Sequence, residues 1–365
     1  MKLSIITINY NNAEGLRKTL ASVASQTYAD IEHVIVDGGS TDGSVEVIRE
    51  YEQSLASRLS PLASNLKWVS EKDTGIYNAM NKGIEIAIGR RIVNAFNRSE
   101  LVEDKYNIID RSECNEDKNK GIEVALGKRV VNDDHTSSPI ANNQLPIALT
   151  DYIQILNSGD ILVAPDVTER MFQAMGNRQW AIDNKTNRQS PIANSPQIPI
   201  FYGNMIKEYP DGLRTKDTCG GEDYTPESFL YFYKGTLNHD CAYIRRDLFE
   251  KYGLYNEEMK ICSDWEWYVR AIVLGGEKTV YTNIDVTVFD MTGISESNGK
   301  NKDIIQKERR EYLESILPAA VLRDYDMYSL PIEQYRRLKK YHLWGVVYFV
   351  ERVLFKLEKW GFLRR

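Results

Sequence analysis

The side chains best suited to chemistry stand where four apolar runs give way to polar turns. They lie in "NYNN" from residue 9, "VDGGSTDG" from residue 36, "SEKDTG" from residue 70 and "LNSGD" from residue 156. Taken alone, each segment could be an ordinary turn, because Asn, Ser, Gly and Asp are common turn residues. Together they form an acid-rich set of hard oxygen ligands. Such a set suits Mg²⁺ or Mn²⁺ next to a phosphorylated ligand, since the cation neutralises both sides.

The elements between these segments are expected to bring them to one edge of a sheet. Strands are predicted at Leu3–Tyr10, Ile31–Asp37 and Leu66–Ser70, and helices at residues 13–26, 44–55 and 75–89. Alternation of this kind implies right-handed crossovers and a parallel sheet. The fourth strand of the same rhythm begins only at Tyr152. Because ligands of open parallel sheets bind outside the carboxyl ends of the strands, the four polar segments are predicted to share one site.

The sequence before Tyr152 repeats itself. "NKGIEIAIGRRIVN" at Asn81–Asn94 recurs as "NKGIEVALGKRVVN" at Asn119–Asn132. Two copies are too few for a solenoid. A second echo, "SPIANNQLPI" and "SPIANSPQIPI", has the Pro- and Asn-rich composition of an exposed loop. Since deleting residues 90–150 and 177–199 restores short connections, we predict that both are insertions into an older fold.

The composition narrows the class of protein. A chain of 365 residues with 42% hydrophobic content can form one large α/β domain or two modest ones. The net charge of -6, from 46 basic and 52 acidic residues, argues against nucleic-acid binding. The four cysteines form no metal-ligand spacing and indicate reduced, cytoplasmic thiols. The first apolar run is too short for a signal peptide, and no run of about 20 apolar residues predicts a membrane span.

Five segments carry a resemblance to a known family. In order, "SIITINYNN", "VIVDGGSTDGS", "EKDTGIYNAMNKGI", "LNSGD" and "FYGNM" resemble the family 2 glycosyltransferases with the GT-A fold. A nicotinamide-binding domain is disfavoured, because the first strand lacks G-x-G-x-x-G. The resemblance, over residues 1–89, 151–176 and 200–300, implies an α/β fold with a Rossmann-like, mostly parallel sheet flanked by helices. It also implies inverting sugar transfer from a nucleotide-diphosphate donor, usually a UDP-sugar, to a glycan or lipid-linked saccharide.

The resemblance also suggests how the chain is organised. Residues 1–216 would form the nucleotide-sugar-binding half and 217–300 the acceptor-binding and catalytic half, followed by a helical extension at 301–365. Residues 335–365 mix Trp, Phe, Leu and Val with Lys and Arg, a pattern typical of helices in the interface of an anionic membrane. A helix packed on the catalytic domain, or a dimer contact, is the alternative. The expected location is cytoplasmic, with peripheral contact to the inner face of the membrane.

By position in the motifs, ten residues would contact the donor: Thr7, Asn9, Tyr10, Asp37, Gly38, Asp73, Asn78, Asn81, Lys82 and Asn157. Asp37 would accept a hydrogen bond from the base, the alternative being a turn aspartate. Asp160 would be the metal ligand, and His239 either a further ligand or a structural histidine. The chain departs from the family in two places. It has Asn-Ser-Gly-Asp where many members have Asp-x-Asp-Asp, and Asn78 where relatives often carry Asp.

The segment "CSDWEWYVRAI" resembles the one in which the family keeps its base. Inverting transfer needs a carboxylate to take the acceptor proton, and we predict Asp264, with Glu266 in reserve. The alternative is that Asp264 only caps the following helix. Trp265 and Trp267 could stack on sugars, although at least one is expected in the core. The loop around Gly293 resembles one that closes over the donor.

The sequence is compatible with two other functions. A nucleotidyltransferase would share the sheet and the metal, but such enzymes usually carry a Gly-rich, basic loop after the first strand, unlike "NYNNAEG". A catalytically inactive nucleotide-sugar-binding relative, compromised by the insertions and by Asn78, is the second alternative.

Overall fold

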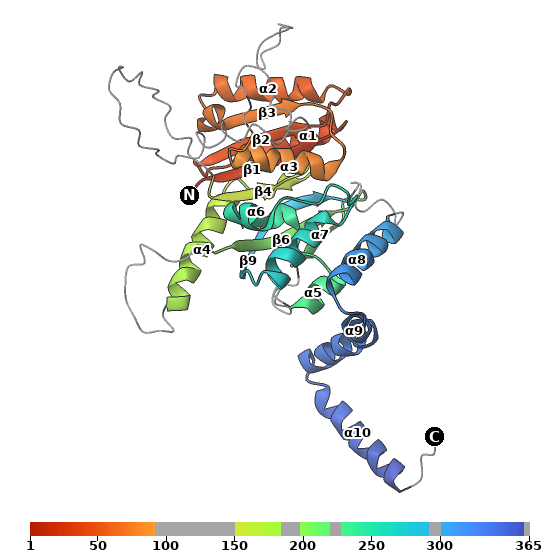
Figure 1. The fold of residues 1–365 in the computed structure, drawn as a ribbon. Helices are drawn as coiled ribbons and strands as arrows, with labels where there is room; N and C mark the ends of the chain where they lie inside the picture. Colours follow the sequence, from red (N-terminus) through yellow and green to blue (C-terminus); the bar gives the residue numbers. More distant parts are fainter. Residues whose placement is uncertain (92, 94–149, 184–197, 220–227, 292–300, 361–365) are drawn as a thin grey trace, which may run out of the picture. The chain divides into compact units, whose positions relative to one another are not determined.

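The computed structural model of the protein describes residues 1–91, 93, 150–183, 198–219, 228–291 and 301–360. Most of the two predicted insertions, the second copy of the repeat and the predicted donor loop at Gly293 lie outside these ranges. Nine strands of the described chain form one sheet (Figure 1). Their order is β3-β2-β1-β4-β8-β6-β9-β5, and β7 pairs with β6.

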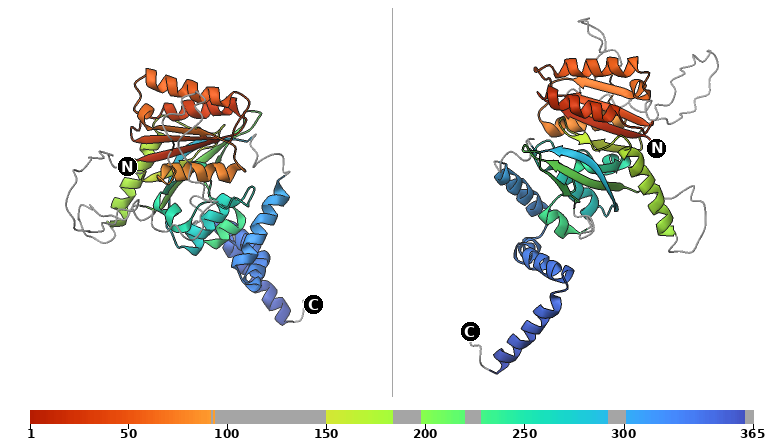
Figure 2. Two further views of the ribbon diagram at one scale, coloured as in Figure 1. Left: turned by 45° about the horizontal axis from the view of Figure 1, so that its top comes forward. Right: turned by 180° about the vertical axis from the view of Figure 1, so that it is seen from behind.

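The first part of the sheet is parallel and follows the predicted alternation. Its strands are β1 (Leu3–Asn9), β2 (Ile31–Asp37), β3 (Leu66–Ser70) and β4 (Tyr152–Ile155). The helices between them are α1 (Ala13–Ala24), α2 (Ser44–Ser57) and α3 (Ile76–Ala87). The chain moves outward from β1 to β3 and then returns to β4 beside β1. Right-handed crossovers therefore place α1 and α2 on one face and α3 on the other (Figure 2).

The second part of the sheet is mixed. Strands β6 (Ile200–Glu208) and β9 (Thr279–Asp290) are parallel, whereas β8 (Ala242–Arg245) runs antiparallel between β4 and β6. The short strands β5 (Ile161–Leu162) and β7 (Arg214–Asp217) are antiparallel to β9 and β6. Because β8 is reversed, its amino end lies at the edge where its neighbours have their carboxyl ends. The predicted mostly parallel α/β sheet is thus confirmed, and the reversal brings a further segment to the site.

Further helices follow along the chain. They are η1 (Pro61–Asn65), α4 (Val167–Asp183), α5 (Phe229–Lys234), η4 (His239–Cys241), α6 (Asp247–Tyr252), α7 (Ser263–Tyr268), the π-helical η5 (Val269–Leu274), α8 (Lys302–Ile316), α9 (Ala319–Lys340) and α10 (Trp344–Lys359). The helix predicted after Cys262 is therefore α7 continued by η5. The predicted helical extension consists of α8, α9 and α10.

Close packing between α3 and the sheet depends on a glycine. All seven residues of β1 are buried, as expected for a central parallel strand. A Cβ added to Gly83 of α3 would lie 2.3 Å from Cγ2 of Ile6, so glycine allows the helix to approach the strand this closely. The short connection of residues 71–75 leads from the end of β3 into α3, so the position of this helix affects the polar segment at that end of the strand.

Both tryptophans of α7 belong to the core. Trp265 and Trp267 are 1% and 0% exposed. Their indole N–H groups donate to the carbonyl oxygens of Phe232 (2.7 Å) and Gly253 (2.8 Å). Burial with a satisfied N–H is the usual arrangement of a core tryptophan. The sugar-stacking alternative is therefore not supported for Trp267, while Trp265 reaches the wall of a cavity described below.

Candidate active site

Polar segments from five neighbouring strands meet at one edge of the sheet. In the spatial order β3, β2, β1, β4, β8 they contribute Asp73, Asp37, Asn9, Asn157 and His239. Adjacent strands are about 4.8 Å apart, so this row extends over about 20 Å. The carboxyl ends of parallel strands thus collect the residues at one edge, as the strand alternation predicts.

Asp37 is enclosed by its own chain. Its Oδ1 accepts hydrogen bonds from Asn9 Nδ2 (2.8 Å) and Ser40 Oγ (2.5 Å). Its Oδ2 accepts from Ser40 N (3.0 Å) and Ser70 Oγ (2.7 Å). The residue is 0% exposed. Because a carboxylate offers about four acceptor positions, a contact between Asp37 and a base would have to displace one of these donors.

Gly38, which follows Asp37 in the chain, leaves its backbone open to two neighbouring side chains. A Cβ on Gly38 would stand 2.3 Å from Asp73 Oδ2 and 3.2 Å from Tyr10 Cδ2, so these two side chains converge over it. The Tyr10 ring is 65% exposed. Burial raises the pKa of Asp73, and the negative charge of Asp37 adds to this rise. An exposed ring and a carboxylate above a bare backbone can receive a planar, polar ligand such as a nucleoside.

Four residues that were predicted to contact the nucleotide-sugar donor instead form hydrogen bonds or ion pairs with other residues of the chain. Thr7 is fully buried and its hydroxyl pairs with His33 Nε2 at 3.0 Å, which leaves it no surface toward a nucleotide. Asn78 and Asn81 both donate to Glu257, at 2.8 Å each, and so connect α3 to the loop before α7. The remaining residue, Lys82, forms an ion pair with Glu71 at 2.8 Å.

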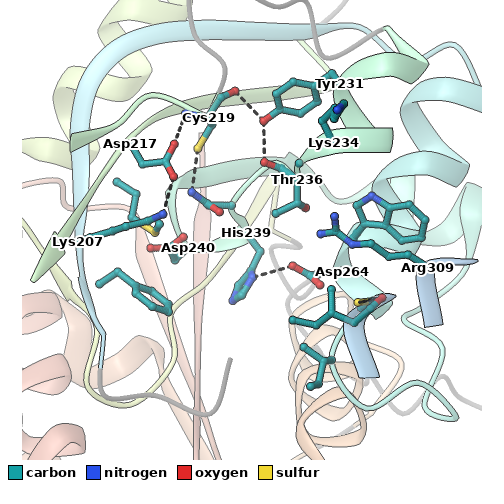
Figure 3. A pocket seen from close by; sticks show the side chains of 18 residues that line it. Lys207, Asp217, Cys219, Tyr231, Lys234, Thr236, His239, Asp240, Asp264 and Arg309 are labelled. Carbon is teal, nitrogen blue, oxygen red and sulfur yellow. Dashed lines mark hydrogen bonds and ion pairs between the residues drawn. The ribbon is translucent and has the colours of Figure 1, made fainter. Parts of the chain in front are cut away.

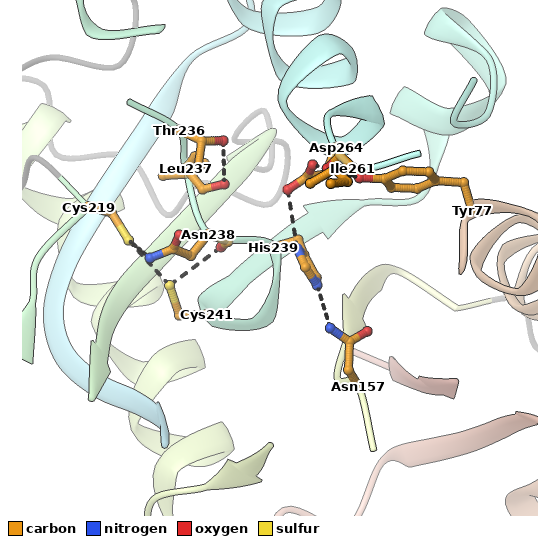
Figure 4. A network of polar contacts seen from close by, with 10 residues as sticks. All are labelled: Tyr77, Asn157, Cys219, Thr236, Leu237, Asn238, His239, Cys241, Ile261 and Asp264. Carbon is orange, nitrogen blue, oxygen red and sulfur yellow. Dashed lines mark hydrogen bonds and ion pairs between the residues drawn. The ribbon is translucent and has the colours of Figure 1, made fainter. Parts of the chain in front are cut away.

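A second group of side chains surrounds the predicted base (Figure 4). Asp264 Oδ1 accepts from the Tyr77 hydroxyl at 3.1 Å, and that hydroxyl also contacts the carbonyl oxygen of Ile261. Asp264 Oδ2 pairs with His239 Nδ1 at 3.3 Å. On the other side of the ring, Asn157 Nδ2 lies 3.2 Å from His239 Nε2. Asp264 is thus held from both sides, by a residue of α3 and by one of η4, which precedes β8.

The electrostatics favour the ionised form of Asp264. Burial by itself would lower the pKa of His239, but the hydrogen bond and the charge of Asp264 outweigh it and raise that pKa. Burial would raise the pKa of Asp264, but the hydrogen bond and charge of His239, with the Tyr77 hydroxyl, lower it. Asp264 is therefore a carboxylate at neutral pH, as a general base must be before it accepts a proton.

Asp264 and His239 line a cavity of about 420 Å³ (Figure 3). Other parts of its wall come from β6, α5 and α8, through Lys207, Lys234 and Arg309. Glu266, the reserve base, does not line this cavity. It is 5% exposed and forms an ion pair with Arg270 at 2.9 Å, one helical turn later. A small acceptor could therefore reach Asp264 but would find Glu266 occupied.

Two residues of the site were not singled out from the sequence. Tyr77 stands beside Asn78 in "GIYNAM", where it reads as one more apolar residue of a helix. Asp240 stands beside His239, is 1% exposed and accepts from Thr287 Oγ1 at 2.6 Å. The position of Asp240 after a polar turn is a signal that could have been noticed. For Tyr77 no such signal exists, because its partner is distant in sequence.

Comparison with known proteins identifies the family of the chain. The sequence profile described as "Glycosyl transferase family 2" matches residues 4–95. A protein of Mycobacterium bovis named PGL/p-HBAD biosynthesis glycosyltransferase is 39% identical over 307 residues, which cover 84% of this chain and 81% of the relative. The chain belongs to glycosyltransferase family 2.

Other relatives match a smaller share of this family 2 chain. An uncharacterized glycosyltransferase of Mycobacterium tuberculosis is 41% identical over 88 residues, so the match spans 24% of this chain and 30% of that protein. Among solved structures, S. aureus TarS 1–349 in complex with UDP is 15% identical with a TM-score of 0.49, over 88% of this chain and 68% of that TarS 1–349 chain. At that TM-score, below 0.5, TarS does not bear on which residues act here.

Family 2 membership raises the question of a divalent cation. Asp160 is 3% exposed, and its Oδ1 accepts from the backbone N–H of Asp290 at 3.0 Å. Burial, and then the charge of neighbouring Asp240, raises the pKa of Asp160 well above its ordinary value. Two close, buried carboxyl groups are the arrangement that a cation relieves. Asn157 Oδ1 is also a buried oxygen without a partner in the described part of the chain.

The fit to a cation is nevertheless incomplete. In the described ranges no group of three or more His, Cys, Asp or Glu side chains is placed to hold a metal ion. Both ring nitrogens of His239 are engaged, so a metal contact there would require Asn157 or Asp264 to turn away. Mg²⁺ is commonly held by one or two carboxylates together with substrate phosphates. Asp160 with Asn157 Oδ1 could contribute to a site of that type.

Proposed function

We propose that this chain is an inverting glycosyltransferase that moves a sugar from a nucleotide-diphosphate donor, with a UDP-sugar as the expected one, to a hydroxyl group. The observation that carries the proposal is Asp264, a carboxylate held by Tyr77 and His239 at the wall of a cavity. Family membership supplies the reaction class. Because Asp264 lines the cavity, a hydroxyl group of an acceptor bound there could come within reach of this base.

The role of Asp264 would be to remove the proton of the acceptor hydroxyl. Inversion is a single displacement, in which the acceptor oxygen forms the new bond to the anomeric carbon as the bond to the diphosphate breaks. The proton passes to a carboxylate oxygen of Asp264, and the nucleotide diphosphate leaves with the electron pair of the broken bond. Tyr77 and His239 would hold the carboxylate in one orientation, which limits the motion that the base must lose before transfer.

The donor would lie along the row of strand ends. Tyr10 would stack on the base, and Asp73 would face the ribose or the diphosphate above Gly38. The buried hydrogen bonds of Asn9 and Asp37 would support the backbone at Gly38. After one of its hydrogen-bond donors is displaced, Asp37 would recognise the base. On this organisation residues 1–216 hold the donor, 217–300 the acceptor and the base, and 301–365 form the helical extension.

A divalent cation, Mg²⁺ or Mn²⁺, belongs to the proposal. When bound, it would stabilise the negative charge of the departing diphosphate. Asp160 would be its principal ligand, supported by Asn157, and His239 would join only after release from its present partners. The raised pKa of Asp160 supports this role, because burial and the charge of Asp240 raise it more than the hydrogen bond from Asp290 N–H and nearby His239 lower it.

The acceptor would be a growing surface glycan or a lipid-linked saccharide. The name of the M. bovis relative, which refers to biosynthesis of PGL and p-HBAD, supports a cell-surface product. A lipid-linked acceptor would bring the enzyme to the inner face of the membrane, with residues 335–365 as the contact. None of the helices in the described ranges is long and apolar enough to cross a bilayer.

The test is a screen of nucleotide sugars for Mn²⁺-dependent release of the nucleotide diphosphate. In Asp264→Asn we expect donor binding to be retained, by calorimetry, and transfer to be lost. In Asp160→Ala we expect the Mn²⁺ dependence to disappear together with most of the activity. Asp211→Ala is the matched control, since Asp211 is an exposed acid in the turn after β6.

Three outcomes would count against the proposal. Release of pyrophosphate instead of a nucleoside diphosphate would indicate a nucleotidyltransferase. Donor binding without turnover, across several acceptors in Mn²⁺, would indicate an inactive relative. Unchanged transfer in Asp264→Asn would remove Asp264 from the role of base.

A further inference from the structure

The helix α10 (Trp344–Lys359) has an apolar face that nothing in the described chain covers. No residue of α10 is buried. Phe349, Val346 and Trp360, just after the helix, are 68%, 61% and 65% exposed. A helix of 16 residues in this state is unusual for a surface element, because side chains of this size are normally packed against a core.

The apolar side chains of α10 are concentrated on one side. At 100° per residue nine of them fall within an arc of roughly 160°, while Trp344, Tyr348 and Phe355 lie outside it. The members of this arc are Leu343, Val346, Val347, Phe349, Val350, Val353, Leu354, Leu357 and Trp360. The rest of the circumference carries the basic residues Arg352, Lys356 and Lys359, of which Lys356 is next to the arc, together with the aromatic residues outside it. An arc this wide and continuous can enter an apolar phase along its full length, about 24 Å.

The charge of the segment differs in sign from that of the chain. Residues 335–360 contain seven basic and two acidic side chains, whereas the chain as a whole has a net charge of -6. Four of the basic residues stand at the end of α9, immediately before α10: Arg336, Arg337, Lys339 and Lys340. This combination of positive charge and an apolar face is complementary to a surface that has an anionic outer layer and an apolar layer beneath it.

We propose that α10 lies in the plane of an anionic phospholipid surface, with its apolar arc in the acyl boundary and its basic side chains at the headgroups. The charged residues of α10 are incompatible with a spanning orientation but suit an in-plane one. A second copy of the chain is the competing occupant. It is disfavoured because a two-fold contact through this face would bring two basic segments together. The inference deepens the proposed lipid-linked acceptor and rests on that part of the proposed function.

The experiment uses the full-length protein and co-sedimentation with vesicles of phosphatidylcholine alone or with 30% phosphatidylglycerol. We expect binding to the anionic vesicles that is at least tenfold stronger than to the neutral ones, and that weakens at 0.5 M salt because exposed charges are then screened. The double variant Val346→Asp with Val353→Asp places two charges in the arc and should lose at least tenfold in binding.

The matched control is Tyr348→Asp with Phe355→Asp. Both side chains are exposed, at 56% and 67%, and lie opposite the arc, so the charge change is the same but the apolar face is preserved. This variant should keep most of its vesicle binding. Circular dichroism and thermal unfolding would verify that both variants are folded, which is expected because all four positions are exposed.

Two results would overturn the inference. Equal vesicle binding by the two double variants would show that the apolar arc is not the contact. Absence of binding to anionic vesicles, with a dimer in sedimentation velocity that Val346→Asp and Val353→Asp dissociate, would assign the face to a second copy. Vesicle binding needs neither donor nor acceptor, so its failure leaves the transfer chemistry standing, and loss of transfer chemistry would leave vesicle binding unaffected.

Discussion

The contact between Tyr77 and Asp264 gives the sharpest test of the site, through the substitution Tyr77→Phe. The change removes one hydroxyl, which donates to Asp264 Oδ1 at 3.1 Å and contacts the Ile261 carbonyl. A hydrogen bond to a charged group contributes about 1.5–3 kcal/mol, and because the two acceptors share a single hydroxyl proton, the contacts are not counted separately. The Asp264 side chain is 15% exposed, so water replaces little of the loss. We expect the free energy of unfolding at pH 7 to fall by about 1.5–3 kcal/mol.

The pH dependence separates a role in catalysis from a role in folding alone. The Tyr77 hydroxyl stabilises the ionised form of Asp264 and so helps to lower its pKa. Removing the hydroxyl raises that pKa toward its ordinary value. Since the base must be ionised, the acidic limb of the kcat/KM profile should move to higher pH in Tyr77→Phe, while the KM for the donor stays the same.

A double-mutant cycle with Asp264→Asn measures the contact directly. The coupling free energy, from urea unfolding at pH 7, should be about 1 kcal/mol or more, because a charged acceptor becomes a neutral one. The control is Tyr255→Phe, since the buried Tyr255 hydroxyl has no partner in the described chain and its loss breaks no hydrogen bond. A coupling below about 0.5 kcal/mol, together with an unmoved acidic limb, would refute the view that Tyr77 holds the base.

Three further predictions concern the elements that support the site. Gly38→Ala puts a Cβ 2.3 Å from Asp73 Oδ2 and should weaken donor binding at least tenfold in calorimetry; an unchanged affinity would place the donor elsewhere. Gly83→Ala, with a Cβ 2.3 Å from Ile6, should destabilise the fold by about 1–3 kcal/mol in urea unfolding, whereas Gly345→Ala, with open space around it, should not. Burial lowers the pKa of His33 to about 3 from an ordinary 6.5, so the unfolded chain alone takes up a proton below pH 6.5. Acidification from pH 7 to 5 should therefore cost about 2 kcal/mol through His33, and His33→Gln should remove this loss; equal pH dependence in both proteins would contradict it.

Much of the fold could be predicted from the order of residue types. The strands and helices of the first part match the predicted ranges within two residues at each end. This is because the spacing of apolar residues that distinguishes a strand from a helix is a local property of the sequence. The prediction that the polar segments meet at one edge of the sheet followed from the parallel direction of the strands alone. Asp264 could be proposed through its motif, whereas the engagement of Glu266 by Arg270 depends on which side of α7 faces the core.

The sequence by itself determined the parallel sheet, the row of polar strand ends and the amphipathic character of the last helix. Each of these depends on residues that are near one another along the chain. Only the tertiary structure decided which side chains form hydrogen bonds with each carboxylate. Asp37 is enclosed by Asn9, Ser40 and Ser70, while Asp264 receives Tyr77 from α3 and His239 from η4. Apart from the contact with Ser40, these contacts join residues at least 25 positions apart, and their geometry follows from packing and strand direction, which no local pattern encodes.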